Sequence, residues 1–336
     1  MPDIVSIGEV LIDFISSEPD VELKDVSSFL KFPGGAPTNV LVVASSLGAE
    51  TGLISRVGND PFGDFLLETL KAKGVDTSQV VRDKDHHTGV VFVELKKAKP
   101  KFTLYKNIAY NFMEISDLNK DYIQNAKVLN FGSVTLLLEP SRSTTLEAIK
   151  IAKDHCTISC DVNFRVDIWR YKLDEMWELA DKALNDVDIL KLGLDEALYL
   201  GEHVNPDLKD PTLDDALEVI YTTFDPKLIA ITMGGKGSRL ILIKNHKIEL
   251  DISQDVYKVV ARDTVGAGDA FFGSLLYMLL KMNKMRSLNL TEKELEQIMT
   301  FCNSFAALST TRKGAWNLPK IDDIMYIPEI KETYLK

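Results

Sequence analysis

Short apolar runs rich in β-branched residues alternate along this chain of 336 residues with segments whose apolar residues recur every three or four positions. The runs are typical of strands, and the segments between them are typical of helices. This alternation predicts an α/β fold in which helices cover both faces of a wound, mostly parallel sheet. The predicted strands are 4–7, 52–57, 128–131, 158–161, 189–192 and 228–233, and the predicted helices include 38–47, 62–73, 141–155, 213–224 and 291–309.

Two polar segments with alternating hydrophobicity interrupt this rhythm, at 11–32 and 88–105. Inserted into a wound sheet, two hairpin-like pieces predict a small second β-sheet beside the large one. The chain contains no internal repeat, low-complexity tract or linker. We therefore expect a single domain over 1–336.

Charge and composition exclude several classes of partner. The chain carries 50 acidic and 39 basic residues, a net charge of −11, which argues against sequence-independent binding to nucleic acid or to anionic membranes. No run approaches the length of about 18 apolar residues that a membrane span needs. Three cysteines in a chain of this length favour a reducing compartment. We expect a cytoplasmic protein with no nucleic-acid partner and no membrane contact.

The most informative local pattern is the turn at 263–269, which reads DTVGAGD. An apolar run at 256–261, interpreted as a strand, precedes it, and an apolar helix is predicted over 270–282. Small residues allow a ligand to approach the backbone, and the unpaired N–H groups of a helix start bind anions. A carboxylate at such a place, Asp269, suits a base that takes the proton from a group attacking phosphate. The alternative is that Asp269 only caps the helix.

Longer stretches carry a family resemblance. The segment 263–274 (DTVGAGDAFFGS) resembles the C-terminal signature of the PfkB, or ribokinase-like, carbohydrate kinases. The segment 34–40 (GGAPTNV) is similar to the N-terminal sugar-binding signature of that family, and further matches at 161–165, 232–237 and 310–314 follow in the family's order. Five matches in order over most of the chain identify it as a member.

The resemblance implies a ribokinase-like kinase domain over 1–336, in which 11–32 and 88–105 form a lid over the sugar. It also implies ATP and Mg²⁺ as cofactors, and we expect a homodimer through the lid. Asp269 would be the catalytic base. The backbone of Gly266, Ala267 and Gly268 would form the anion hole for the transferred phosphoryl group.

The same resemblance assigns residues to the sugar. Asp13 would accept hydrogen bonds from two adjacent hydroxyls, although it could be a solvated loop acid. Arg165 would contact a sugar hydroxyl or the moving phosphoryl group, and a structural salt bridge is the alternative. The full set of substrate-binding residues is Asp13, Gly34, Gly35, Asn39, Tyr105 and Arg165.

Further positions are implied for the nucleotide. The loop 232–237 would cover the ATP phosphates, although a hairpin turn has the same pattern. It is not a Walker A motif, because Gly237 follows the lysine where Ser or Thr is required. Glu196 would organise magnesium, and Asn303 would reach the adenine unless it is an exposed helical residue. The full set is Lys191, Glu196, Thr232, Gly234, Gly235, Gly237 and Asn303.

A loop that reads TTRKGA, at 310–315, resembles the family's site for a monovalent cation, here K⁺. Its ligands would be the side chain of Asp263 and carbonyl oxygens of Val265, Ser309, Arg312 and Gly314. The alternative is an ordinary helix end with Gly314 as its cap.

The segments GEVLIDF and GGAPTN look most like those of fructokinases. We therefore expect the ATP-dependent conversion of D-fructose to fructose 6-phosphate. A 2-keto-3-deoxygluconate kinase is the alternative, with Lys106 and Arg165 available for an acidic substrate. A catalytically silent sugar-binding regulator is a second alternative, which the intact Asp269 argues against.

Overall fold

The computed structural model describes residues 1–96, 99–105, 107–164 and 173–325. A nine-stranded sheet forms its centre, in the order β13-β12-β11-β10-β9-β8-β1-β4-β5. All neighbours from β11 to β5 pair in parallel, and β12 and β13 extend one edge antiparallel. The strands are β1 Ile4–Ile7, β4 Thr51–Gly58, β5 Val75–Asp83, β8 Val128–Gly132, β9 Thr157–Asp161, β10 Ile189–Gly193, β11 Leu228–Thr232, β12 Ser238–Lys244 and β13 Lys247–Gln254.

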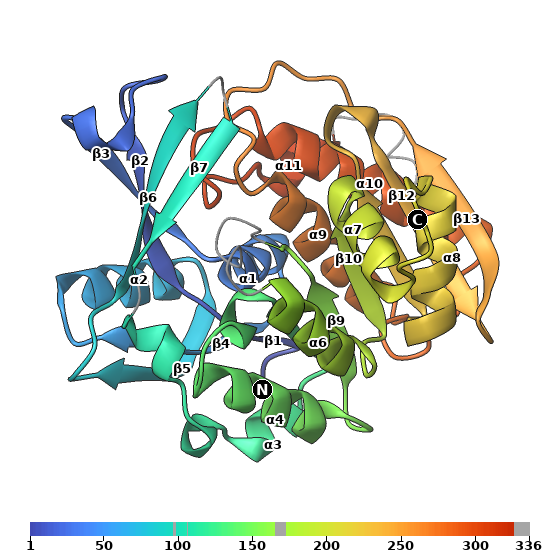
Figure 1. Cartoon of the computed structure of the whole chain (residues 1–336), viewed down its shortest axis with the longest axis horizontal. Coiled ribbons are helices and arrows are strands. Elements are labelled where there is room, and N and C mark those ends of the chain that lie inside the picture. The colour runs from blue at the N-terminus through green and yellow to red at the C-terminus, as the bar shows by residue number, and fades with distance from the viewer. Residues whose placement is uncertain (97–98, 106, 165–172, 326–336) are drawn as a thin grey trace.

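Helices cover both faces of this sheet (Figure 1). One face packs on α1 Ala36–Leu47, α2 Pro61–Ala72, α9 Ala267–Lys281 and α10 Glu292–Ser309, and the other on α4 Ser141–Ala152, α6 Leu173–Leu184, α7 Leu194–Val204 and α8 Leu213–Phe224. Strand β11 supplies both cores, because Leu228 and Ala230 face one helix layer while Ile229 and Ile231 face the other. Within the described residues, no helix has the length and apolar character needed to span a bilayer.

Shorter helices complete the connections. They are α3 Lys120–Gln124, α11 Ile321–Met325 and the 3₁₀ turns η1 Leu23–Asp25, η2 Ala109–Phe112, η3 Ile115–Asp117, η4 Val134–Leu136 and η5 Gly234–Lys236.

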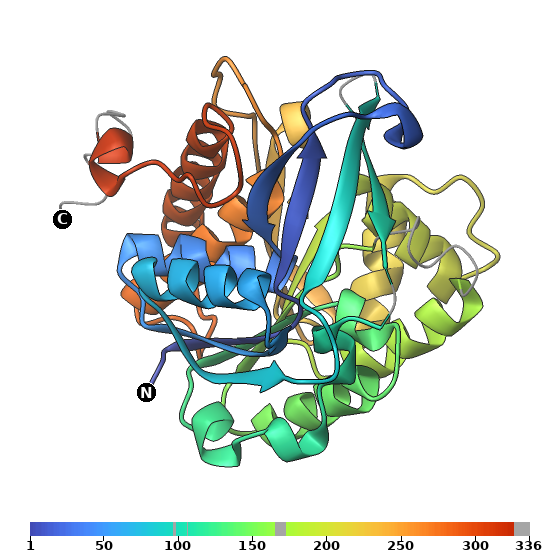
Figure 2. The ribbon, with the colours of Figure 1, turned by 90° about the vertical axis from the view of Figure 1, so that its left-hand side faces the viewer.

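A separate four-stranded sheet has the order β3-β2-β6-β7. Its strands are β2 Leu11–Ser16, β3 Phe29–Gly34, β6 Gly89–Lys96 and β7 Lys99–Leu104, and only β2 and β6 pair in parallel. Figure 2 shows this small sheet standing above the layers of the large sheet and its helices. The predicted fold class, a wound and mostly parallel sheet with a small second sheet, is confirmed.

One predicted strand is wrong. The apolar run 256–261 forms no strand, and Val260 is 88% exposed. The chain leaves the sheet at Gln254, the last residue of the edge strand β13, and crosses to the start of α9 with no neighbouring strand to pair with. Several apolar side chains of the run instead line a cavity. The apolar residues of 256–261 therefore form part of a cavity wall and not a buried strand.

Candidate active site

A cavity of about 680 Å³ lies between the carboxyl end of β11, the amino end of α9 and one face of α10. Of the seven residues predicted to bind the nucleotide, five line it, namely Thr232, Gly234, Gly235, Gly237 and Asn303. Ala267 and Gly268 of the 263–269 turn line the same cavity. The structure thus brings both glycine-rich motifs to one place, at the carboxyl edge of the parallel strands, where α/β folds bind ligands.

The glycine-rich loop joins β11 to β12 and forms η5. The loop is therefore a hairpin turn between antiparallel strands, as the alternative held, and its glycines also line the cavity. Gly237 has φ 91°, and a Cβ atom there would lie 2.0 Å from the carbonyl oxygen of Gln254. No larger residue fits at this position without moving the edge strand β13.

Asn303 is buried, so the alternative of an exposed helical residue is wrong. Its Oδ1 accepts a hydrogen bond from Ser238 Oγ at 2.8 Å, and its Nδ2 donates to Gln254 Oε1 at 3.2 Å. The apolar residues Val256 and Val259 line the same cavity. An apolar wall with a few fixed polar groups suits a flat heteroaromatic base.

The 263–269 turn leads directly into α9. Gly266, with φ 80°, precedes the first helical residue, and its left-handed backbone favours glycine. Asp269 is the third residue of the helix, so the alternative that it is the N-cap is wrong. The N–H of Ala267 donates to the carbonyl oxygen of Thr264 at 3.2 Å. Gly268 is therefore a better candidate than Ala267 for an N–H aimed at an anion.

Asp269 is 8% exposed and contacts a residue that was predicted to bind the sugar. Asn39 Nδ2, from α1, donates to Asp269 Oδ2 at 2.7 Å. Asn39 Oδ1 in turn accepts from the indole nitrogen of Trp316 at 2.6 Å. No sequence pattern indicated this contact of Trp316.

Lys191 places a buried cation beside the same turn. Its Nζ donates to both carboxylate oxygens of Asp161, at 2.9 and 3.1 Å. Burial works against the charged form of Lys191, but the carboxylates of Asp161 and Glu196 outweigh it and raise the lysine pKa. The ammonium group also lies 3.2 Å from the place of a Cβ on Gly268. Sequence reasoning gave Asp161 no role of its own.

Glu196 closes the first turn of α7, where its Oε2 accepts from the N–H of Gly193 at 2.6 Å. Among the described residues, no cluster of three or more His, Cys, Asp or Glu side chains is grouped around a metal position. Magnesium in kinases is held by one or two carboxylates together with nucleotide phosphates and water. The residues here fit that arrangement, and the assignment of Glu196 to magnesium stays a prediction.

The predicted sugar residues lie where the small sheet meets α1. Asp13 sits within β2, so the alternative of a loop acid is wrong. A Cβ at Gly34 would lie 2.2 Å from Asp13 Oδ2, and a Cβ at Gly35 would lie 2.3 Å from the carbonyl oxygen of Glu9. Burial, together with the negative charges of Glu9 and Asp13, raises the pKa of Tyr110. Two carboxylates thus lie near one buried phenol.

Tyr105 and Arg165 were also predicted to bind the sugar, and Lys106 to bind an acidic substrate. Tyr105 follows β7, is 55% exposed and packs edge-on against Phe92 with ring centroids 6.0 Å apart. Arg165 and Lys106 lie outside the described residues.

Asp263 joins the 263–269 turn to the 310–315 loop. Its two carboxylate oxygens accept from the N–H groups of Val265 at 3.0 Å and Gly314 at 2.9 Å. Helix α10 ends at Ser309 with Thr310 as its cap, so the alternative that Gly314 caps the helix is wrong. The loop is built around Asp263, and the potassium site stays a prediction.

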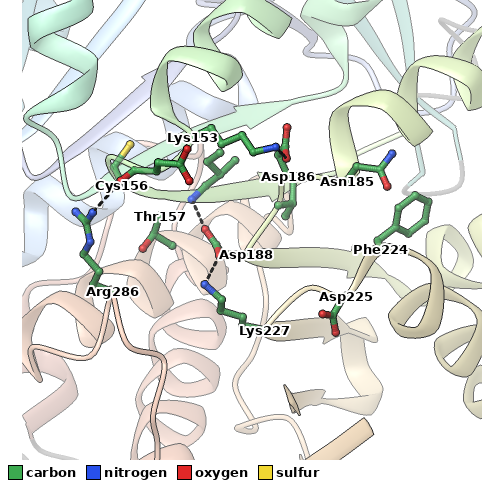
Figure 3. A pocket seen from close by; sticks show the side chains of 13 residues that line it. Lys153, Cys156, Thr157, Asn185, Asp186, Asp188, Phe224, Asp225, Lys227 and Arg286 are labelled. Atoms are coloured by element: carbon green, nitrogen blue, oxygen red, sulfur yellow. Dashed lines mark hydrogen bonds and ion pairs between the residues drawn. The ribbon is translucent and has the colours of Figure 1, made fainter. Parts of the chain in front are cut away.

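A second cavity, of about 400 Å³, lies at the amino ends of β9, β10 and β11 (Figure 3). Lys153 pairs with Asp186 and Lys227 pairs with Asp188, each at 2.7 Å, and the Arg286 guanidinium donates to backbone carbonyls. Its basic side chains thus have partners within the protein. None of the predicted site residues lines it, so the candidate site is the cavity at the carboxyl ends.

Known proteins resemble the chain over nearly its whole length. A family model described as "pfkB family carbohydrate kinase" matches residues 1–321. An uncharacterized sugar kinase of Pyrococcus horikoshii is 43% identical over 330 residues, which cover 98% of this chain and 97% of the relative. Fructokinase-1 of Zea mays is 33% identical over 336 residues, covering 97% of each chain.

Solved structures agree. The Pyrococcus horikoshii kinase in complex with ATP matches with a TM-score of 0.84 at 42% identity, over 98% of this chain and 99% of that one. A double mutant of the fructokinase of Vibrio cholerae O395, with fructose, ADP and potassium ion bound, matches with a TM-score of 0.82 at 28% identity. That match covers 96% of this chain and 97% of the other.

Proposed function

The chain belongs to the pfkB family of carbohydrate kinases, and on that premise we propose that it transfers a phosphoryl group from ATP to the 6-hydroxyl of D-fructose. Membership of the family makes the protein an ATP-dependent sugar kinase, and the choice of fructose as its substrate is our proposal. One observation carries it. Asp269 is buried and accepts a hydrogen bond from Asn39, a predicted sugar residue, while the adjacent Gly268 lines the cavity of the nucleotide motifs.

Asp269 acts as the base at the point of transfer. A free aspartate has a pKa of about 3.9, which is too low to ionise an alcohol in advance. In the loose transition state of phosphoryl transfer, the attacking oxygen loses its proton late. Asp269 therefore orients the hydroxyl and accepts its proton as the bond to phosphorus forms.

Positive charge comes from the other side of the turn. Lys191 is buried and charged, and its ammonium group faces Gly268 at the start of α9. With the N–H of Gly268, it stabilises the equatorial oxygens of the phosphoryl group. Glu196 would help ATP to hold Mg²⁺, which would supply further charge neutralisation when bound.

Asp13 favours a neutral sugar over an acidic one. Its carboxylate lies against Gly34 on the small sheet, where it accepts hydrogen bonds from sugar hydroxyls and repels a substrate carboxylate. The fructokinase names among the relatives support the same substrate. The small sheet serves as the lid over the sugar and as the contact of a homodimer.

A coupled assay for ADP release tests the proposal. The purified protein is assayed with ATP and, in separate reactions, with fructose, 2-keto-3-deoxygluconate, ribose, tagatose phosphate and nucleosides. We expect kcat/KM to be highest for fructose, and ³¹P NMR to identify fructose 6-phosphate as the product. A higher kcat/KM for 2-keto-3-deoxygluconate would contradict fructose as the substrate, but it would still support a sugar kinase.

A further inference from the structure

Three side chains from distant parts of the chain form one line of hydrogen bonds. Trp316 Nε1 donates to Asn39 Oδ1 at 2.6 Å, and Asn39 Nδ2 donates to Asp269 Oδ2 at 2.7 Å. Trp316 follows α10, Asn39 belongs to α1 and Asp269 to α9. All three are buried, with exposed fractions of 5, 7 and 8%.

The chemistry of the two ends fixes the direction of the amide between them. An indole N–H can only donate, and an ionised carboxylate can only accept. Asn39 satisfies both neighbours in one orientation, with its oxygen toward Trp316 and its nitrogen toward Asp269. A reversed amide would set oxygen against carboxylate and N–H against N–H. Trp316 therefore reinforces the orientation in which Nδ2 of Asn39 meets Asp269.

Packing holds the indole in place. Trp316 belongs to the core that α1, α9 and α10 share. The preceding residue, Ala315, packs so closely on Gly266 that a Cβ atom there would lie 2.6 Å from the Ala315 Cβ. The donor is thus fixed to the same scaffold as the 263–269 turn. Removing it would leave the Asn39 amide held at one end only, by its hydrogen bond to Asp269.

We propose that Trp316 is a positioning residue: its indole N–H fixes the Asn39 amide, which in turn holds the Asp269 carboxylate in the orientation that receives the sugar hydroxyl. The inference rests on the proposed role of Asp269 as the base. It adds a residue that acts through Asn39 and does not itself touch the reacting atoms.

The kinetic test uses Trp316→Phe, which removes the N–H and keeps an aromatic ring in the core. We expect kcat to fall about ten- to hundredfold, as misorientation of a reacting group does, while KM for ATP stays within about twofold. Asn317→Ala is the matched control, because this neighbouring side chain is exposed and is not part of the site. It should keep wild-type kcat.

A double-mutant cycle tests whether Trp316 acts through Asn39. Asn39→Leu has a similar shape and removes the polar link. If the proposal holds, Trp316→Phe lowers kcat less than about twofold further in the Asn39→Leu background. Independent, multiplicative effects of the two changes would overturn it, and so would a kcat for Trp316→Phe within about twofold of the wild type.

A spectroscopic readout separates this inference from the proposed activity. In ¹⁵N-labelled protein without ligands, the indole N–H of Trp316 should exchange slowly with solvent, and Asn39→Leu should shift its resonance and speed its exchange. This result requires no turnover, so it can stand even where the assignment of the substrate fails. An indole resonance that Asn39→Leu leaves unchanged would contradict the hydrogen bond and the inference with it.

Discussion

The ammonium nitrogen of Lys191 lies 3.2 Å from the position that a Cβ atom would occupy on Gly268. Lys191 is the central residue of β10, a strand inside the large sheet, and Gly268 is the second residue of α9. The absence of a side chain on Gly268 lets the buried cation reach the start of the helix, where positive potential is already present. The two residues together make the proposed binding place for the transferred phosphoryl group.

Gly268→Ala should therefore separate activity from stability. Alanine in a helix is favoured over glycine by up to about 1 kcal/mol, which offsets the displacement of the Lys191 ammonium group, so the melting temperature should change little. The added methyl group presses on the end of Lys191 and covers the backbone N–H, and we expect kcat to fall at least about tenfold. Thermal unfolding and steady-state kinetics on the same sample check both. Undiminished kcat would mean that the phosphoryl group binds elsewhere.

Lys191→Met should impair both stability and activity. It leaves Asp161 as a buried charge without its cation, which costs about 3 to 5 kcal/mol in the free energy of unfolding. Adding Asp161→Asn removes that charge, so the double variant should regain much of the stability in urea unfolding. It should not regain kcat, because the cation at the turn is still missing. Recovery of both together would show that Lys191 only serves the fold.

The raised pKa of Lys191 also sets a pH dependence. Its folded pKa lies above the ordinary value of 10.5, so the stability that this group contributes is fully present below pH 10.5 and is lost as pH rises through the folded pKa. The wild type should thus lose stability in alkaline solution more steeply than the Lys191→Met, Asp161→Asn double variant. Urea unfolding from pH 8 to 11.5 measures the difference, and parallel curves would contradict it.

Asp13→Ala tests the choice of sugar. Two hydroxyls of fructose lose a charged acceptor, which should cost roughly 2 to 4 kcal/mol in kcat/KM. An acidic sugar gains relief from repulsion, so 2-keto-3-deoxygluconate should be harmed less. Kinetics of the wild type and of Asp13→Ala on both substrates give the comparison. Equal losses would point instead to Arg165 and Lys106 as the specificity pair.

Potassium dependence tests the loop around Asp263. We expect activity in millimolar KCl to be severalfold higher than in tris buffer without alkali cations, and Asp263→Ala to abolish that response. Asp263 also accepts two backbone hydrogen bonds, so unfolding of this variant must be followed in parallel. A wild type that is indifferent to potassium would leave the carboxylate with a purely structural role.

Local patterns in the sequence predicted the six strands from β11 to β4, since β11 is a continuous apolar run and β10 is apolar apart from Lys191, but they did not indicate β5, β12 or β13. The glycine-rich loop around Gly234 does follow a strand, as its pattern predicted, and its place over the ATP phosphates stays a prediction. The run 256–261 was misjudged, since apolar content does not separate a strand from a cavity wall. The contact of Trp316 with Asn39 joins residues 277 positions apart, and no spacing rule predicts such a pair.

The most direct test of the account is the turnover of Asp269→Asn with fructose and ATP. A positioned base contributes about two to four orders of magnitude, so kcat should fall by that factor while the dissociation constant for fructose, measured by calorimetry, stays within about threefold. That outcome would establish Asp269 as the group that accepts the proton. A kcat within about threefold of the wild type would remove Asp269 from the reaction and contradict the central claim.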